Sequence, residues 1–132
     1  MTISEHIDEA IAALKAAKPG DPYLPTQLQE RIASLLFKGG NNLLGGWSSV
    51  AKALSDQGKA LALYTVLFPD DDWLLGKGRV RADEPLFGFR AFRAGEAAVL
   101  TPEQMAPLVS TEHDVCAIAI MMGALERRKQ LP

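Results

Sequence analysis

The chain has few of the residues that cross-link a protein or bind metals. Among its 132 residues are one cysteine, Cys116, and two histidines, His6 and His113. A lone cysteine excludes an internal disulfide and a zinc site made only of cysteines, and it fits a reducing compartment. A zinc site needs three or four ligands, so His113 and Cys116 would require His6 or a carboxylate such as Asp114 to converge on them. We therefore predict no metal, no cofactor and a cytoplasmic location.

Long apolar runs and an excess of one charge are also missing. The longest apolar stretch, Ala60 to Phe68, is far shorter than the roughly 20 residues that cross a bilayer. The first residues carry acids where a signal peptide carries cations, so we expect neither membrane insertion nor export by that route. The formal net charge is -2 and the cations are dispersed, which argues against a general attraction to nucleic acid.

The remaining composition is that of an average soluble domain. Hydrophobic residues make up 48% of the chain and charged residues 23%. A chain of this length can bury most of the apolar surface that its unfolded form exposes. We expect residues 1–132 to form a single globular domain with one core.

Two amphipathic helices are predicted near the N-terminus. Apolar residues recur every three or four positions in residues 3–17 and again in residues 26–38. Each run begins near a threonine that is followed three residues later by an acid or an amide, which is the capping-box pattern of helix starts. Each helix has one apolar face that must be buried, so we expect the two helices to pack on each other.

Two structures are compatible with residues 48–68. Apolar residues there alternate spacings of four and three, which would suit one long helix ended by Pro69. Gly58 would instead be a natural helix C-cap, and residues 64–68 are rich in strand formers, so a helix followed by a buried strand fits equally well. The sequence leaves this choice open.

The period changes to that of a strand in residues 76–93, which predicts a β-hairpin turning near Asp83. A short helix is predicted to open at Thr101, and a longer terminal helix is predicted over residues 111–130. The predicted fold class is α+β and helix-dominated: a helical layer of about five helices that carries a β-hairpin or small antiparallel sheet around residues 76–93.

Three short patterns resemble parts of catalytic or ligand-binding motifs but lack the rest. The glycine pairs of residues 39–46 lack the lysine of a phosphate-binding loop, because Trp47 stands in its place. Ser49 and Lys52 have the spacing of a serine–lysine nucleophile without its other motifs. The acids Asp70–Asp72 lack the glycine and glutamate of a calcium loop, and we expect a solvated turn or a helix cap.

The predicted hairpin is the strongest candidate for a binding surface. Arginine and aromatic side chains dominate the energetics of protein interfaces, and the hairpin interleaves them. We assign to this candidate interaction surface Arg79, Arg81, Phe87, Phe89, Arg90, Phe92 and Arg93.

Three functions are compatible with these patterns. We expect a non-catalytic protein-interaction or regulatory module, whose partner is another protein or a second copy of the chain. A winged-helix-like nucleic-acid-binding domain is the first alternative, with residues 48–54 as the reading helix and Arg79 and Arg81 in the wing. A small enzyme is the second alternative; its site would assemble from Glu112, His113, Asp114 and Arg90.

Overall fold

The computed structural model describes residues 2–17, 26–36, 50, 52–54, 56–81, 84–93 and 107–130, with the side chains of 26, 27, 79–81 and 84 outside the description. The described elements are α1 (Ile3–Ala16), α2 (Thr26–Leu36), α4 (Gln57–Leu67), β1 (Asp71–Arg81), β2 (Glu84–Arg93), β3 (Val109–His113) and α6 (Cys116–Lys129). The fold is α+β and helix-dominated, which confirms the predicted class. The short helix expected at Thr101 and the glycine pairs of 39–46 lie outside the described residues.

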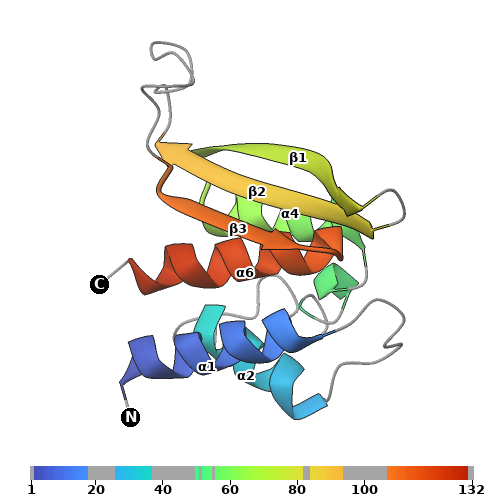
Figure 1. Ribbon diagram of the computed structural model, residues 1–132. Helices are drawn as coiled ribbons and strands as arrows, with labels where there is room; N and C mark the ends of the chain where they lie inside the picture. The colour runs from blue at the N-terminus through green and yellow to red at the C-terminus, as the bar shows by residue number, and fades with distance from the viewer. Residues whose placement is uncertain are drawn as a thin grey trace.

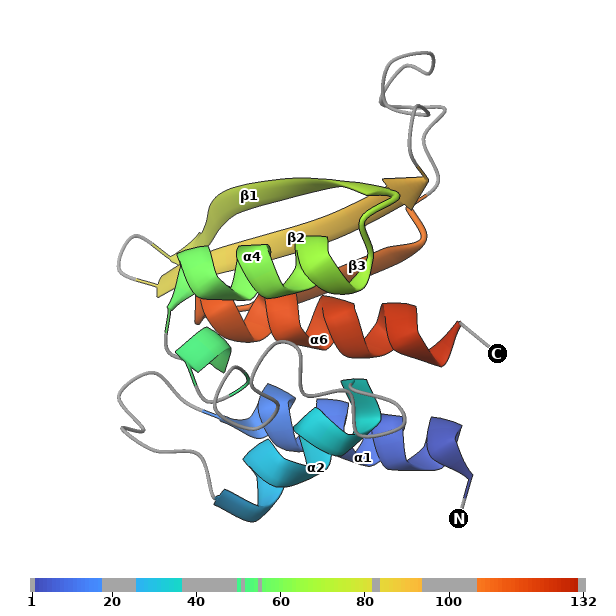
Figure 2. The ribbon, with the colours of Figure 1, turned by 180° about the vertical axis from the view of Figure 1, so that it is seen from behind.

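The elements form three layers. Figure 1 shows the three-stranded sheet above α4 and α6, with α1 and α2 below α6. Figure 2 shows from behind that α4 lies beneath β1. Helix α6 contacts β2, β3, α4, α1 and α2, and every residue from Cys116 to Leu125 is buried. The core is therefore organised around α6, and the face of the sheet turned away from α4 and α6 carries no described helix.

Helix α1 begins as its sequence pattern predicts, and it packs against α2 as expected. The Thr2 hydroxyl accepts a hydrogen bond from the Glu5 backbone N–H, which caps α1. In the apolar stripe of α1, Ile7 and Leu14 are fully buried and Ile11 is 8% exposed, whereas Ile3 in the first turn is 56% exposed. Outside the core, Arg31 of α2 forms an exposed ion pair with Glu9 of α1 at 3.0 Å.

The segment before Pro69 adopts neither of the two structures predicted for residues 48–68, because a separate helix, α4, begins at Gln57. Asp56 is extended, and its carboxylate accepts a hydrogen bond from the Lys59 N–H at 3.0 Å, so a new helix starts at Gln57. Gly58 lies in the first turn of this helix, not at a C-cap. The predicted single long helix and the predicted buried strand at residues 64–68 are therefore both wrong.

Tertiary packing explains why strand-forming residues end up in a helix. The Tyr64 side chain is fully buried, and its ring lies 5.0 Å from the ring of Phe68 and 4.9 Å from that of Phe89. Strand propensity amounts to about 1 kcal/mol at most, which is less than the roughly 1.5–3 kcal/mol gained by burying one large apolar side chain. Burial of Tyr64 and Leu63 therefore decides the helical structure.

The hairpin is confirmed and is longer than predicted, because β1 begins at Asp71. The strands β1 and β2 are antiparallel, with Leu75 opposite Phe89 and Gly76 opposite Gly88. The third strand, β3, pairs with β2 on its other side and completes a sheet of order β1-β2-β3.

The terminal helix starts later than predicted. Residues 111–113 belong to β3, where Val109, Thr111 and His113 are buried and the two residues between them are exposed. The Thr111 hydroxyl donates a hydrogen bond to the Ala119 carbonyl at 2.6 Å, which ties the strand to α6. β3 also supplies hydrogen-bond partners to the second edge of β2. Among the described residues, no helix has the length and apolar character needed to cross a membrane.

Candidate functional site

The seven residues proposed as an interaction surface do not share one face of the sheet. Successive side chains of a strand point to opposite faces. Phe89 is fully buried against the helices, and Phe92, at 2% exposure, is also buried. Phe87 is half-buried, with the Lys77 ammonium 5.8 Å from its ring centroid. The phenylalanines therefore serve mainly in packing.

The four arginines of the proposed surface are placed differently. Arg90 and Arg93 are exposed on β2, three residues apart and hence on opposite faces by strand alternation. Arg79 and Arg81 lie on β1, but their side chains are outside the described part of the structure. Of the five whose side chains are described, Arg90 alone lines the candidate site described next.

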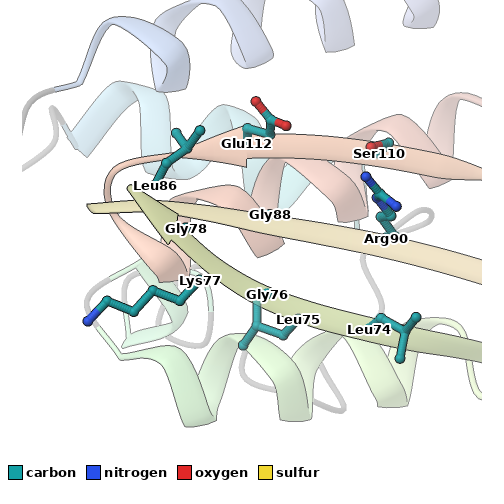
Figure 3. Close-up of a pocket in the computed structure, with 10 residues that line it drawn as sticks. All are labelled: Leu74, Leu75, Gly76, Lys77, Gly78, Leu86, Gly88, Arg90, Ser110 and Glu112. Atoms are coloured by element: carbon teal, nitrogen blue, oxygen red, sulfur yellow. The ribbon is translucent and has the colours of Figure 1, made fainter. Parts of the chain in front are cut away.

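The face of the sheet that carries no described helix contains a hollow of about 530 Å³. We call this region the open face, and Figure 3 shows the side chains around it. Gly76 and Gly88 lie opposite each other at its centre, and a Cβ atom at either position would meet no other atom within 4 Å. The hollow thus exists because the two middle strand positions have no side chains. The residues that line it are Leu74, Leu75, Gly76, Lys77, Gly78, Leu86, Gly88, Arg90, Ser110 and Glu112.

The open face combines apolar and charged groups. Leu74 is 52% exposed. Figure 3 shows the Arg90 side chain reaching toward β3, beside Ser110, its partner in the strand register. Glu112 lies opposite Gly88 on β3. Among the described residues, neither Arg90 nor Glu112 forms an ion pair, so both charges are available to a partner.

The acids Asp70–Asp72 do not form a cation site. Asp70 is an exposed turn residue, whereas the Asp71 side chain is 4% exposed. Its carboxylate accepts two hydrogen bonds from Arg127, at 2.7 and 3.2 Å, and one from the Tyr64 hydroxyl at 2.8 Å. The expected solvated turn is therefore correct for Asp70 and wrong for Asp71, which joins β1, α4 and α6.

This buried network shifts the pKa values of its members. Burial, followed by the hydrogen bond to Asp71, raises the pKa of Tyr64 far above its usual range. The hydrogen bonds to Asp71 raise the pKa of Arg127 despite partial burial. The guanidinium therefore stays charged and the phenol stays neutral, a structural arrangement in which a buried carboxylate is paired.

His113 and Cys116 do not form a nucleophilic pair. The Nδ1 atom of His113 accepts a hydrogen bond from the Val115 N–H at 2.8 Å and lies 2.9 Å from a carboxylate oxygen of Asp114. Burial raises the pKa of the Cys116 thiol, the opposite of what a thiolate nucleophile requires. The described residues contain no group of three or more potential metal ligands from histidine, cysteine, aspartate and glutamate.

The serine–lysine pair lies only partly within the described structure. Lys52 is exposed in a helical segment, and Ser49 lies outside the described residues. Of the scattered residues considered for an enzyme site, Glu112 and Arg90 face the hollow, whereas His113 is buried on the opposite side of β3.

Sequence reasoning missed most of the open face. From the sequence, Arg90 is assigned to a binding surface, but Leu74, Gly76 and Gly88 are not. A signal was present in the spacing of Gly76 and Gly78, because glycines two positions apart in a strand leave one face without side chains. Using that signal requires the pairing with Gly88, which only the register supplies.

The chain matches no family model, and neither a curated protein nor a solved structure matches it. The site geometry is therefore the basis on which a function can be proposed.

Proposed function

We propose that the protein is a non-catalytic, cytoplasmic protein-interaction module that binds its partner through the open face. The observation that carries this proposal is the hollow of about 530 Å³ over Gly76 and Gly88. A glycine floor allows close approach of another chain, and a half-exposed leucine beside it can be buried by a partner. The buried thiol of Cys116 supports a reducing location.

The charges around the hollow indicate the chemistry of the partner. Arg90 can form a bidentate pair with a carboxylate. Lys77 also borders the hollow, but its ammonium lies 5.8 Å from the centroid of the Phe87 ring, so we assign the ion pair with the partner to Arg90. Leu74 and Leu86 provide the apolar contacts. We therefore propose a partner that places an apolar side chain over the glycine floor and a carboxylate against Arg90.

The first experiment locates the interface in the cell. A photoreactive benzophenone amino acid is introduced in place of Gly76, where the structure leaves open space. The matched control carries the same group in place of Val66, which is 54% exposed on α4. We expect a protein to cross-link from position 76 and not from position 66. Equal cross-linking from both positions would count against the open face.

The second experiment measures affinity with the purified cross-linked partner. Leu74→Glu places a charge in the hollow, and we expect a loss of affinity of about tenfold or more, a change readily resolved by calorimetry. Val66→Glu makes the same change on an equally exposed aliphatic residue of α4 and should leave the dissociation constant unchanged. An unchanged constant for Leu74→Glu would refute the proposed surface.

A salt titration separates this proposal from the winged-helix alternative. Phosphate binding releases counterions, so its affinity falls steeply between about 50 and 200 mM salt. We expect weak or no binding of random-sequence DNA and RNA, even at low salt. Micromolar binding at low salt that is lost in the folded double variant Arg79→Ala and Arg81→Ala would favour the nucleic-acid function.

A further inference from the structure

Strand β3 is an edge strand with a groove beside it. It pairs with β2 on one side, and no other described strand pairs with it. Alternate residues of an edge strand direct their N–H and C=O groups away from the sheet, where they can pair with another strand. Figure 3 shows α1 past the β3 edge of the sheet and α4 past the β1 edge.

The groove along this edge has a volume of about 410 Å³. Ile11 and Lys15 of α1 line one side, and Ser110, Thr111 and Glu112 of β3 line the other. Met122 and Glu126 of α6 also line it. The groove thus offers the hydrogen-bonding groups of an edge strand along one side, which is the feature that binds extended peptides by strand addition. Ile11 and Met122, 8% and 2% exposed, contribute only the floor of the groove.

The alternation along β3 determines which side chains an added strand would need. Thr111 faces the helices, so neighbouring side chains of the added strand would point toward the groove floor. Ile11 and Met122 there are 8% and 2% exposed, so small apolar side chains fit better than charged ones.

Glu112 is exposed on the opposite face, so side chains beside it should be basic. Lys15 and Glu126, which also line the groove, carry opposite charges. Charge complementarity at Glu112 therefore favours an extended segment in which apolar and basic residues alternate.

The position of α1 favours a single extended segment over a second copy of the chain. A second copy would bring its own α6 beneath its β3, as in this molecule, where α6 packs directly under the strand. In that position the α6 helix of a second copy would meet α1, because Ile11 and Lys15 border the space beside the edge. A strand without a helix attached behind it requires far less room.

We propose that the edge of β3 binds an extended segment of the partner protein as a fourth strand, with its apolar residues toward Ile11 and Met122 and a basic residue beside Glu112. The proposal rests on the proposed function as an interaction module and adds the form in which the partner is recognised. The open face and the β3 edge share Ser110 and Glu112, so one partner can occupy both.

The experiment uses a short synthetic peptide of alternating lysine and valine as the probe. One control peptide replaces alternate valines with proline, which keeps the charge but removes backbone donors; a second replaces lysine with glutamate. We expect both controls to bind at least about tenfold more weakly, a difference that fluorescence anisotropy resolves. In hydrogen exchange, the lysine–valine peptide should protect alternate amides within Val109–His113.

Charge reversal provides the test on the protein side. Glu112→Lys changes an exposed residue, so the fold should be retained, and we expect the lysine–valine peptide to bind about tenfold more weakly. Glu30→Lys makes the same change on an exposed residue of α2 and should leave binding unchanged. Equal losses in both variants would show that only net charge matters and would overturn the proposal.

The remaining outcomes separate this proposal from the one on which it rests. No peptide binding, or equal binding of the proline peptide, would overturn strand addition. If protection appears at Leu74–Gly76 and Gly88–Arg90 and not in β3, strand addition is wrong while the open face is supported. If a partner cross-links from position 76 and binds without protecting β3, the interaction module stands and the edge proposal fails.

Discussion

The contact between Gly123 and Phe89 gives the sharpest test of this packing. A Cβ atom added at Gly123 of α6 would lie 2.4 Å from Cδ1 and 2.7 Å from Cε1 of the Phe89 ring. Carbon atoms normally pack at about 3.5–4.0 Å, so Gly123→Ala would bring a methyl group roughly 1 Å too close. Phe89 is fully buried and packs edge-on against Tyr64, so its ring has little room to move.

The magnitude follows from two opposing effects. Overpacking a core costs about 1–3 kcal/mol, and more where the neighbour cannot shift. Replacing glycine with alanine inside a helix returns about 1 kcal/mol of helix propensity. Because the Phe89 ring has little room to move, we place the overpacking cost at the top of this range, at about 3 kcal/mol. After subtraction of the gain in helix propensity, Gly123→Ala should lower the free energy of unfolding by about 2 kcal/mol. At roughly 4 °C per kcal/mol, the melting temperature should fall by about 8 °C.

The assay is thermal and urea unfolding of three variants beside the unmodified protein. Gly88→Ala on the open face is the control, because its Cβ meets nothing within 4 Å; it should be neutral or stabilising by up to about 1 kcal/mol. Phe89→Leu combined with Gly123→Ala should be less destabilised than the sum of the single changes, since the clash is relieved. A Gly123→Ala protein as stable as the unmodified one would refute the close packing of β2 on α6.

Three further predictions concern stability. Ile7→Ala should lower the free energy of unfolding by about 2–5 kcal/mol because Ile7 is fully buried. Glu9→Ala should cost less than about 1 kcal/mol because its ion pair is exposed. If denaturant melts show equally small losses for both variants, Ile7 is not buried in the core. Burial and the hydrogen bond to Asp71 raise the pKa of Tyr64 above the value of 10.0 that its unfolded form keeps, so stability is fully present below pH 10 and falls above it as the unfolded state releases a proton. The stability difference between the unmodified protein and Tyr64→Phe should therefore narrow as the pH rises beyond 10 in urea melts, and a constant difference would be incompatible with a buried phenol. A chelator should leave the melting temperature unchanged, because the described residues hold no cluster of three potential metal ligands; a loss of several degrees that zinc restores would show that a site exists.

The elements that the sequence predicted well depend on local interactions. The helix α1 has a hydroxyl cap at Thr2 and a 3.6-residue apolar period, and both signals lie within a few residues of one another. The hairpin has a two-residue period over 76–93, which is equally local. These signals were sufficient for the fold class.

The candidate site was predicted less well because it depends on pairing between distant segments. The glycine floor requires Gly76 to lie opposite Gly88, and the charge of Glu112 reaches the same surface only because β3 pairs with β2. The arginine and aromatic composition of the hairpin drew attention to Phe89 and Phe92, which the fold buries. Composition alone does not show which face of a strand a side chain occupies.

The sequence by itself determined the helices at its start, the hairpin and the α+β class, because caps, turns and periodicity act over a few residues. The tertiary structure decided the rest: that Tyr64 is helical, that residues 109–113 form a strand, and that Asp71 is buried beneath Arg127. In each case a contact between distant parts of the chain outweighs a local preference of about 1 kcal/mol or less. Such contacts exist only once the sheet has been assembled on α6.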